Sequence, residues 1–113
     1  MKRILGLMLG TTTLIGCNAN PVVDPPVLAA CPSTITISTS SNVYTTTSCS
    51  LKIGTPITIQ ARTGHPLSGS GAGRAIWSAT TDQNIGFTVE GKFDFQCDFH
   101  GAGGMKGSIT VIP

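Results

Sequence analysis

Residues 93–111 read FDFQCDFHGAGGMKGSITV, and this stretch decides the fold and the site that we expect for the chain. Apolar and polar residues alternate from Phe93 to Cys97, as is typical of a strand with one buried face, so the thiol should point toward the core. A glycine-rich segment follows and can fold back tightly before a second alternating run. We therefore expect His100 and Met105 to lie near the Cys97 sulfur.

The three side chains that this stretch brings together form a soft ligand set. A Cys and two His residues with a long axial Met are typical of a blue-copper electron-transfer site. The chain has only two histidines, so His65, after an expected strand at 57–61, is the candidate for the second imidazole. Zinc could bind the same Cys and His ligands tetrahedrally. Hydrolysis by a Cys97–His100 pair needs an exposed thiolate, whereas the alternation predicts burial.

At these positions the sequence resembles the cupredoxins, and especially their plastocyanin-like branch. The last ligand loop of that family has Cys, two residues, His, four residues and Met, which correspond here to Cys97, His100 and Met105. The resemblance implies one copper ion that cycles between Cu(I) and Cu(II), and electron transfer to transient redox protein partners rather than enzymatic catalysis. The ligands that it implies are His65, Cys97, His100 and Met105.

Two positions depart from the family pattern. The family commonly has Asn directly after the first His, and its backbone N–H donates to the Cys sulfur, whereas Pro66 has no N–H to donate. Either one hydrogen bond to the thiolate is missing, which should lower the reduction potential, or His65 is placed differently. Phe99 stands where plastocyanins often have Pro, and it adds apolar surface beside His100.

The rest of the domain consists of short alternating or β-branched runs separated by Gly- and Pro-containing turns. We expect strands at 34–37, 43–46, 51–53, 57–61, 75–78, 86–89, 92–97 and 108–112. No stretch has convincing helical periodicity. Seven or eight short strands predict an all-β, Greek-key sandwich or barrel, as in the cupredoxins. Residues 68–73 (SGSGAG) lack the Lys of a phosphate-binding loop and are expected to be a flexible connection.

The N-terminus reads as an export signal rather than as part of the domain. Lys2 and Arg3 precede an apolar run that is too short to span a bilayer, and the ending Leu14-Ile15-Gly16-Cys17 resembles a bacterial lipobox. Residues 1–16 would be removed and Cys17 acylated, although an ordinary secretory signal is the alternative. The protein would then be membrane-anchored and face the periplasm or cell surface. Asn18 in place of Asp would imply the outer membrane in a Gram-negative source.

Removal of this signal divides the chain and changes its charge. A Pro-rich tether (17–30) then precedes a copper-binding domain (31–113). The chain carries seven Lys+Arg and five Asp+Glu, and the loss of Lys2 and Arg3 leaves five of each. A neutral domain gives no reason to expect a nucleic-acid partner. We expect a monomer.

The number of cysteines indicates which of them form a disulfide and which one remains a free thiol. Four cysteines less an acylated Cys17 leave three, of which one has no intramolecular partner in an oxidising compartment. The simplest assignment pairs Cys31 with Cys49 and leaves Cys97 for chemistry, but Cys97 could instead belong to the disulfide.

Two functions other than electron transfer stay open. One is an envelope copper-storage or trafficking protein that uses the same site. The other is a metal-free structural β-sandwich lipoprotein, in which Cys97 pairs with Cys31 or Cys49.

Overall fold

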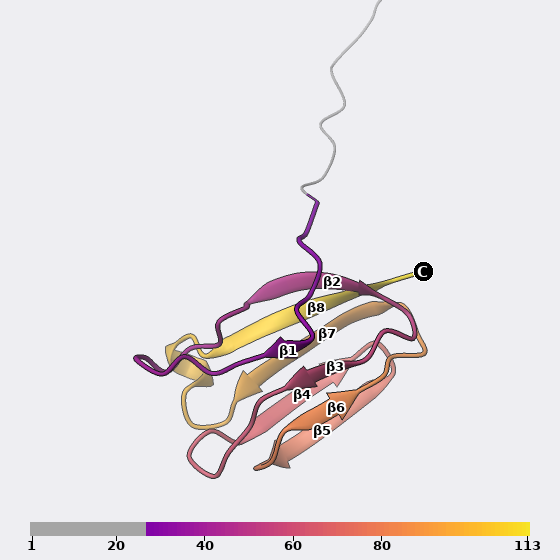
Figure 1. Cartoon of the computed structure of the whole chain (residues 1–113). Coiled ribbons are helices and arrows are strands. Elements are labelled where there is room, and N and C mark those ends of the chain that lie inside the picture. The colour runs from indigo at the N-terminus through magenta and orange to yellow at the C-terminus, as the bar shows by residue number, and fades with distance from the viewer. Residues whose placement is uncertain (1–26) are drawn as a thin grey trace, which may run out of the picture.

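The computed structural model describes residues 27–113, which form two β-sheets packed face to face (Figure 1). The smaller sheet has the order β1-β3-β6, with strands Thr34–Ile35, Ile57–Ile59 and Gln83–Ile85. The larger sheet has the order β2-β8-β7-β4-β5, with strands Ser48–Lys52, Lys106–Ile112, Gly91–Cys97, Leu67–Gly71 and Arg74–Ala79. The pairs β1–β3 and β2–β8 are parallel and the others antiparallel. The all-β sandwich prediction is confirmed. The predicted signal, Cys17 and the first part of the tether lie outside the described residues.

Two of the predicted strands do not form in the structure. Within 43–46 only Tyr44 pairs, through a single bridge to Ile37. The expected strand at 86–89 is absent from the described chain, and β6 lies just before it. Phe87 is nevertheless fully buried, because its ring packs edge-on against Phe93 with centroids 5.2 Å apart. The apolar signal at Phe87 therefore reflects packing in the core and not strand pairing.

The Gly- and Ser-rich segment expected to be a flexible connection is strand β4 and the turn that follows it, so that expectation was wrong. Close packing explains the composition. A Cβ at Gly69 would lie 2.6 Å from Phe93 Cζ, and a Cβ at Gly71 would lie 1.9 Å from the carbonyl oxygen of Lys92. Gly71 also has a φ of +122°, which side-chain-bearing residues rarely adopt. Glycine is required here because β7 approaches β4 so closely.

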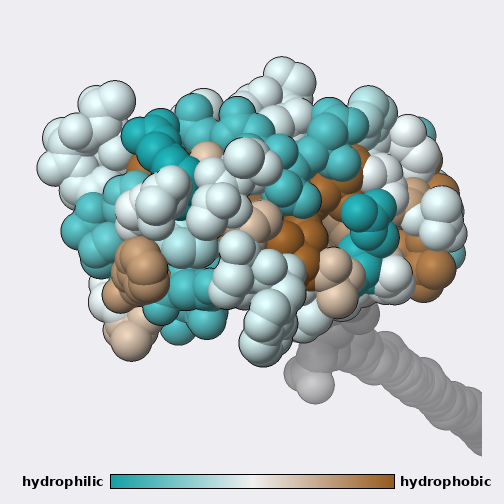
Figure 2. All heavy atoms as spheres, turned by 90° about the horizontal axis from the view of Figure 1, so that it is seen from below, coloured by the Kyte–Doolittle hydropathy of each residue, from teal (hydrophilic) through white to brown (hydrophobic). Residues whose placement is uncertain are grey.

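The face seen in Figure 2 is mostly polar, and its apolar residues form separate small patches. The most exposed large apolar side chains are Val27, Trp77 and Phe99, at 96%, 90% and 68% exposure. Phe99 belongs to the loop after β7, whereas Trp77 lies on β5. Among the described residues, no helix has the length and apolar character needed to cross a membrane.

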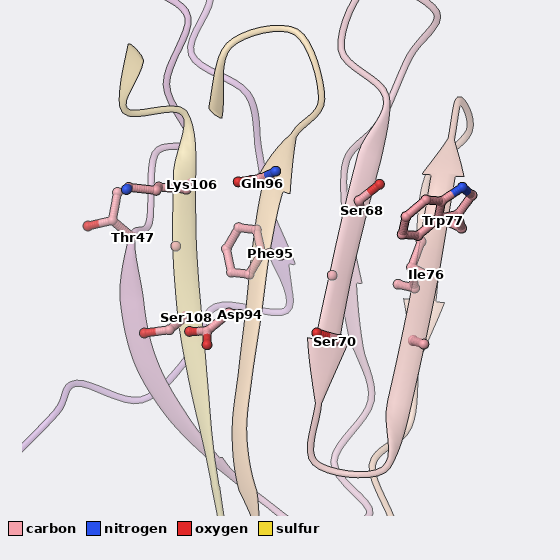
Figure 3. Close-up of a pocket in the computed structure, with 13 residues that line it drawn as sticks. Thr47, Ser68, Ser70, Ile76, Trp77, Asp94, Phe95, Gln96, Lys106 and Ser108 are labelled. Atoms are coloured by element: carbon pink, nitrogen blue, oxygen red, sulfur yellow. The ribbon is translucent and has the colours of Figure 1, made fainter. Parts of the chain in front are cut away.

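The side chains of strand β7 alternate between the buried inner face and the exposed outer face of the larger sheet. Phe93, Phe95 and Cys97 are buried, while Asp94 and Gln96 are exposed on the outer face, as the alternation predicted. Figure 3 shows the strands of this sheet with the residues that line a hollow on its outer face. The inner face of β7 thus contributes to the core and the candidate metal site, and its outer face contributes to a separate hollow.

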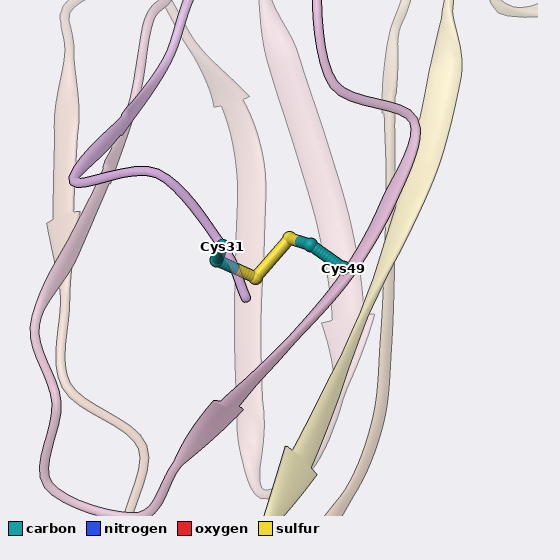
Figure 4. Close-up of a disulfide and its surroundings, with 2 residues drawn as sticks. All are labelled: Cys31 and Cys49. Carbon is teal, nitrogen blue, oxygen red and sulfur yellow. A yellow bond between two sulfur atoms is a disulfide. The ribbon is translucent and has the colours of Figure 1, made fainter. Parts of the chain in front are cut away.

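A disulfide joins Cys31 to Cys49, which confirms the predicted pairing (Figure 4). It connects the segment before β1 to strand β2, and so links the first part of the domain to the larger sheet. The backbone N–H of Cys31 also donates to the carbonyl oxygen of Ser50 at 2.8 Å. Cys97 is a free, buried thiol, so the alternative in which it pairs with one of the other two is wrong.

Candidate metal centre

Three side chains converge at one end of the sandwich: one from the end of strand β7 and two from loops. The Cys97 sulfur lies 3.7 Å from Nδ1 of His65 and 3.5 Å from Nδ1 of His100. The ligand atoms of all three residues lie within 4.8 Å of one another. The two imidazole rings are tilted, with centroids 4.9 Å apart. The structure therefore brings together the two histidines and the cysteine that the sequence pointed to.

The loop from β7 to β8 is held closed by its own backbone. The N–H of Cys97 donates to the carbonyl oxygen of Met105 at 2.9 Å, and the N–H of Met105 donates to that of His100 at 3.1 Å. A 3₁₀ turn at Gly101–Gly103 reverses the chain between them. Met105 is fully buried. Residues eight positions apart thus become neighbours, which brings the Met105 backbone against the two ligand residues on its loop.

His65 enters the site from the loop between β3 and β4. Its backbone pairs with that of Arg62, and the His65 N–H donates to the Arg62 carbonyl oxygen at 2.8 Å. The Pro66 carbonyl oxygen in turn accepts the N–H of Asp98 at 2.9 Å. The two ligand loops are therefore joined directly, and the backbone of Pro66 runs beside Cys97. The His65 ring nitrogen lies 3.7 Å from the Cys97 sulfur, and the next residue, Pro66, has no backbone N–H to donate.

The electrostatics of the site favour a neutral imidazole at His65. Burial lowers the pKa of His65, and the neighbouring His100 and Arg62 lower it further. A deprotonated ring nitrogen is the form that binds a metal.

The donor set and its spacing fit a single metal ion. Metal–ligand bonds of about 2.0 Å to nitrogen and 2.3 Å to sulfur, at angles between tetrahedral and trigonal, place the two atoms about 3.5–3.7 Å apart. The observed separations of 3.5 and 3.7 Å match this range. A thiolate and two imidazoles with a buried thioether on the same loop are the softer set that copper prefers. His65, Cys97 and His100 would hold the ion, and Met105 would supply a thioether sulfur to it.

The sequence did not single out two groups that surround the site. Tyr44 is buried, its ring meets Phe95 edge-on at 5.0 Å, and its hydroxyl has no hydrogen-bond partner within the described chain. Burial raises the Tyr44 pKa, and the charges of Cys97 and Asp98 add to this effect. The Ser78 hydroxyl donates to the carboxylate of Asp98, directly after the ligand Cys97. Only Tyr44 had a signal in the sequence, because it lies in the β-branched run at 43–46 that predicted a strand; the Ser78 contact had none.

Comparison with known proteins identifies the fold. No protein-family model matches this sequence, and no curated protein sequence matches it. Among solved structures, oxidised plastocyanin from Dryopteris crassirhizoma superposes with a TM-score of 0.54 at 14% identity, over 71% of this chain and 100% of plastocyanin. A reduced amicyanin variant superposes with a TM-score of 0.51 at 22% identity, over 70% of this chain and 80% of amicyanin.

A third structure, a purple cupredoxin from Nitrosopumilus maritimus, superposes with a TM-score of 0.50 at 19% identity, over 72% of this chain and 100% of that one. The chain therefore has the cupredoxin fold. The sequence-based recognition of that fold from residues 86–112 is confirmed.

Proposed function

We propose that this protein is an electron carrier with one type 1 copper ion bound by His65, Cys97, His100 and Met105. The observation that carries the proposal is the convergence of one buried thiol and two imidazole nitrogens within 4.8 Å. Copper bound by such ligands alternates between Cu(I) and Cu(II) and so carries one electron. The rigid sandwich and the paired loops hold the donor atoms in one geometry, which keeps reorganisation between the two oxidation states small.

The surface beside His100 supports exchange of electrons with a partner and not the binding of a substrate. Phe99 is 68% exposed next to the site, and the short glycine-rich turn of 101–104 lies beside it. Together they form a small apolar docking surface of the kind that suits brief, weak contacts between redox proteins. We propose that electron donors and acceptors dock here, and that the protein itself catalyses no reaction.

We also propose that the domain is exported and held at a membrane through an acylated Cys17, after removal of residues 1–16. The Cys31–Cys49 disulfide supports export, because such bonds persist in oxidising compartments. Segment 17–30 would then act as a tether that lets the domain reach its partners in the periplasm or at the cell surface. Mass spectrometry of the protein from membranes would detect acylation as a lipid mass on an N-terminal Cys17.

The test of the copper proposal is reconstitution of the purified protein with Cu(II). One equivalent should produce an intense visible band from thiolate-to-copper charge transfer, and further copper should not increase it. Voltammetry should show a reversible one-electron couple, and NMR line broadening in mixed oxidation states should show fast self-exchange. A colourless product would contradict the proposal. Slow self-exchange with rapid release of Cu(I) to a competing chelator would favour the copper carrier instead.

Replacing Pro66 with Asn is expected to raise the reduction potential. The variant supplies a backbone N–H directly after the ligand His65. A hydrogen bond from this N–H to the Cys97 sulfur would withdraw charge from the thiolate and favour Cu(I). We expect a shift of about 40 mV, the equivalent of about 1 kcal/mol for a one-electron couple. Voltammetry measures it. Pro56→Ala, in the exposed turn before β3, is the matched control and should leave the potential unchanged. An unchanged or lower potential in Pro66→Asn would show that the N–H does not bond to the sulfur.

A further inference from the structure

A second feature of the molecule lies on the outer face of the larger sheet. The strands β5, β4, β7 and β8 form the floor of a hollow with a volume of about 740 Å³ (Figure 3). The metal ligands do not line it: Cys97 points to the inner face of β7, whereas Asp94 and Gln96 point outward into the hollow. The proposed electron transfer gives this face no role.

The floor of the hollow has two rows of polar side chains across the strands, with the register row of Gly69, Phe95 and Gly107 between them. In one row Lys106, Gln96 and Ser68 are register partners on β8, β7 and β4. In the next row the register partners on the same strands are Ser108, Asp94 and Ser70. The rows offer hydroxyl, carboxamide, carboxylate and ammonium groups, which together can both donate and accept hydrogen bonds. Within a row, neighbouring side chains lie about 4.8 Å apart, which is the spacing of the strands, and the two rows lie two residues apart along each strand. A ligand with many hydroxyl groups could therefore meet several of them.

Trp77 borders these rows on β5 and is the one tryptophan of the chain. It is 90% exposed, which is unusual for so large an apolar side chain. An exposed indole offers a flat apolar face together with an N–H donor. A ligand that matches this hollow needs an apolar flat side for the indole and hydroxyl groups for the floor. A pyranose ring has both, because its C–H bonds gather on one face and its hydroxyl groups lie around the rim.

The charges that line the hollow favour a neutral ligand over an anionic one. Asp94 and Lys106 line the hollow and contribute one charge of each sign, and the Lys92 ammonium lies 3.8 Å from the Asp94 carboxylate. A nucleic-acid or sulfated-glycan site would need several uncompensated cations. We propose that this hollow is a binding site for neutral oligosaccharides, with Trp77 stacking on a sugar ring and with Asp94 and Gln96 binding its hydroxyl groups. The inference is independent of the copper site.

The experiment is a titration of the copper-free and copper-loaded full protein with cellohexaose and, separately, chitohexaose. Fluorescence of the protein reports directly on Trp77, so saturable binding should change its emission, with the same affinity in both metal states. Isothermal titration calorimetry then compares variants. Trp77→Ala should weaken binding at least about tenfold, and Gln96→Ala or Asp94→Asn about fivefold. Phe99→Ala, another exposed aromatic but beside the copper site, is the matched control and should bind like the parent.

Three outcomes would overturn the proposal. The first is the absence of binding by either oligosaccharide at millimolar concentration. The second is tighter binding of a heparin hexasaccharide than of both neutral probes, which would assign the face to anionic ligands. The third is a dimer in analytical ultracentrifugation that Trp77→Ala dissociates, which would assign the face to a second copy of the chain. Because Trp77→Ala should keep the blue band, failure here leaves the proposed copper function standing.

Discussion

Replacing Cys97 with Ser is expected to abolish the blue absorption band of the copper-loaded protein. The band requires a copper–thiolate bond, and Cys97 is the free cysteine among the described residues. Loss of groups that only orient a metal ligand commonly costs 10- to 100-fold in metal affinity, so loss of the thiolate itself should cost more than about 100-fold. Absorption spectroscopy and competition with a Cu(II) chelator would measure both effects.

Two further variants make this result specific. Asp94→Asn lies on the same strand but on its outer face, so it should keep the full band and the copper affinity. His65→Ala removes a ligand while leaving the thiolate, and it should replace the normal band with a weaker, shifted one. Circular dichroism of the copper-free variants should match that of the parent. A normal blue spectrum in Cys97→Ser would refute the site, and a normal spectrum in His65→Ala would show that this imidazole is not a ligand.

Removal of the disulfide is expected to destabilise the domain by about 3 kcal/mol, because the bond closes a loop between positions separated by 18 residues. Small domains have only about 5–15 kcal/mol of total stability, so the loss is a large fraction. The midpoint of thermal unfolding should fall by roughly 12–24 °C for a domain of this size. The double variant Cys31→Ala/Cys49→Ala, unfolded in the copper-free state by heat and by urea, would measure the change.

The contribution of the cross-link must be separated from packing, because Cys49 is buried. Unfolding of the parent protein with and without dithiothreitol changes only the bond, and it should reproduce most of the difference. Ser48→Ala, an exposed neighbour on β2, is the matched control and should change stability by less than about 0.5 kcal/mol. A double variant as stable as the parent would mean that the sheets alone hold this part of the chain.

The cost of losing the disulfide follows from the size of the core. The described core consists of 18 buried apolar residues around Phe87, Phe93 and Phe95. A domain this small buries a lower share of its surface than a larger one, and a cross-link between the first segment and β2 compensates for this. The disulfide therefore stabilises the frame in which the ligand loops are held, without touching the metal site.

Much of the site was predictable because its information is local. Cys97, His100 and Met105 lie within nine positions, and a glycine-rich reversal between two strands brings them together whatever the rest of the chain does. Strand β7 was predictable for the same reason, since side chains on a strand alternate between its faces with a period of two. Parity of the cysteines favoured the disulfide before the structure showed it.

Features that depend on contacts between distant segments required the tertiary structure. His65 is 32 positions from Cys97, and only the pairing of β4 with β7 places its nitrogen 3.7 Å from the sulfur. The segment SGSGAG has the composition of a loop, yet its first four residues belong to strand β4. Its glycines are there because β7 packs too closely for any side chain at Gly69. The polar rows beside Trp77 exist only in the register of four strands. Local spacing thus encoded the ligand loop, whereas packing and register between strands decided which distant residues would meet.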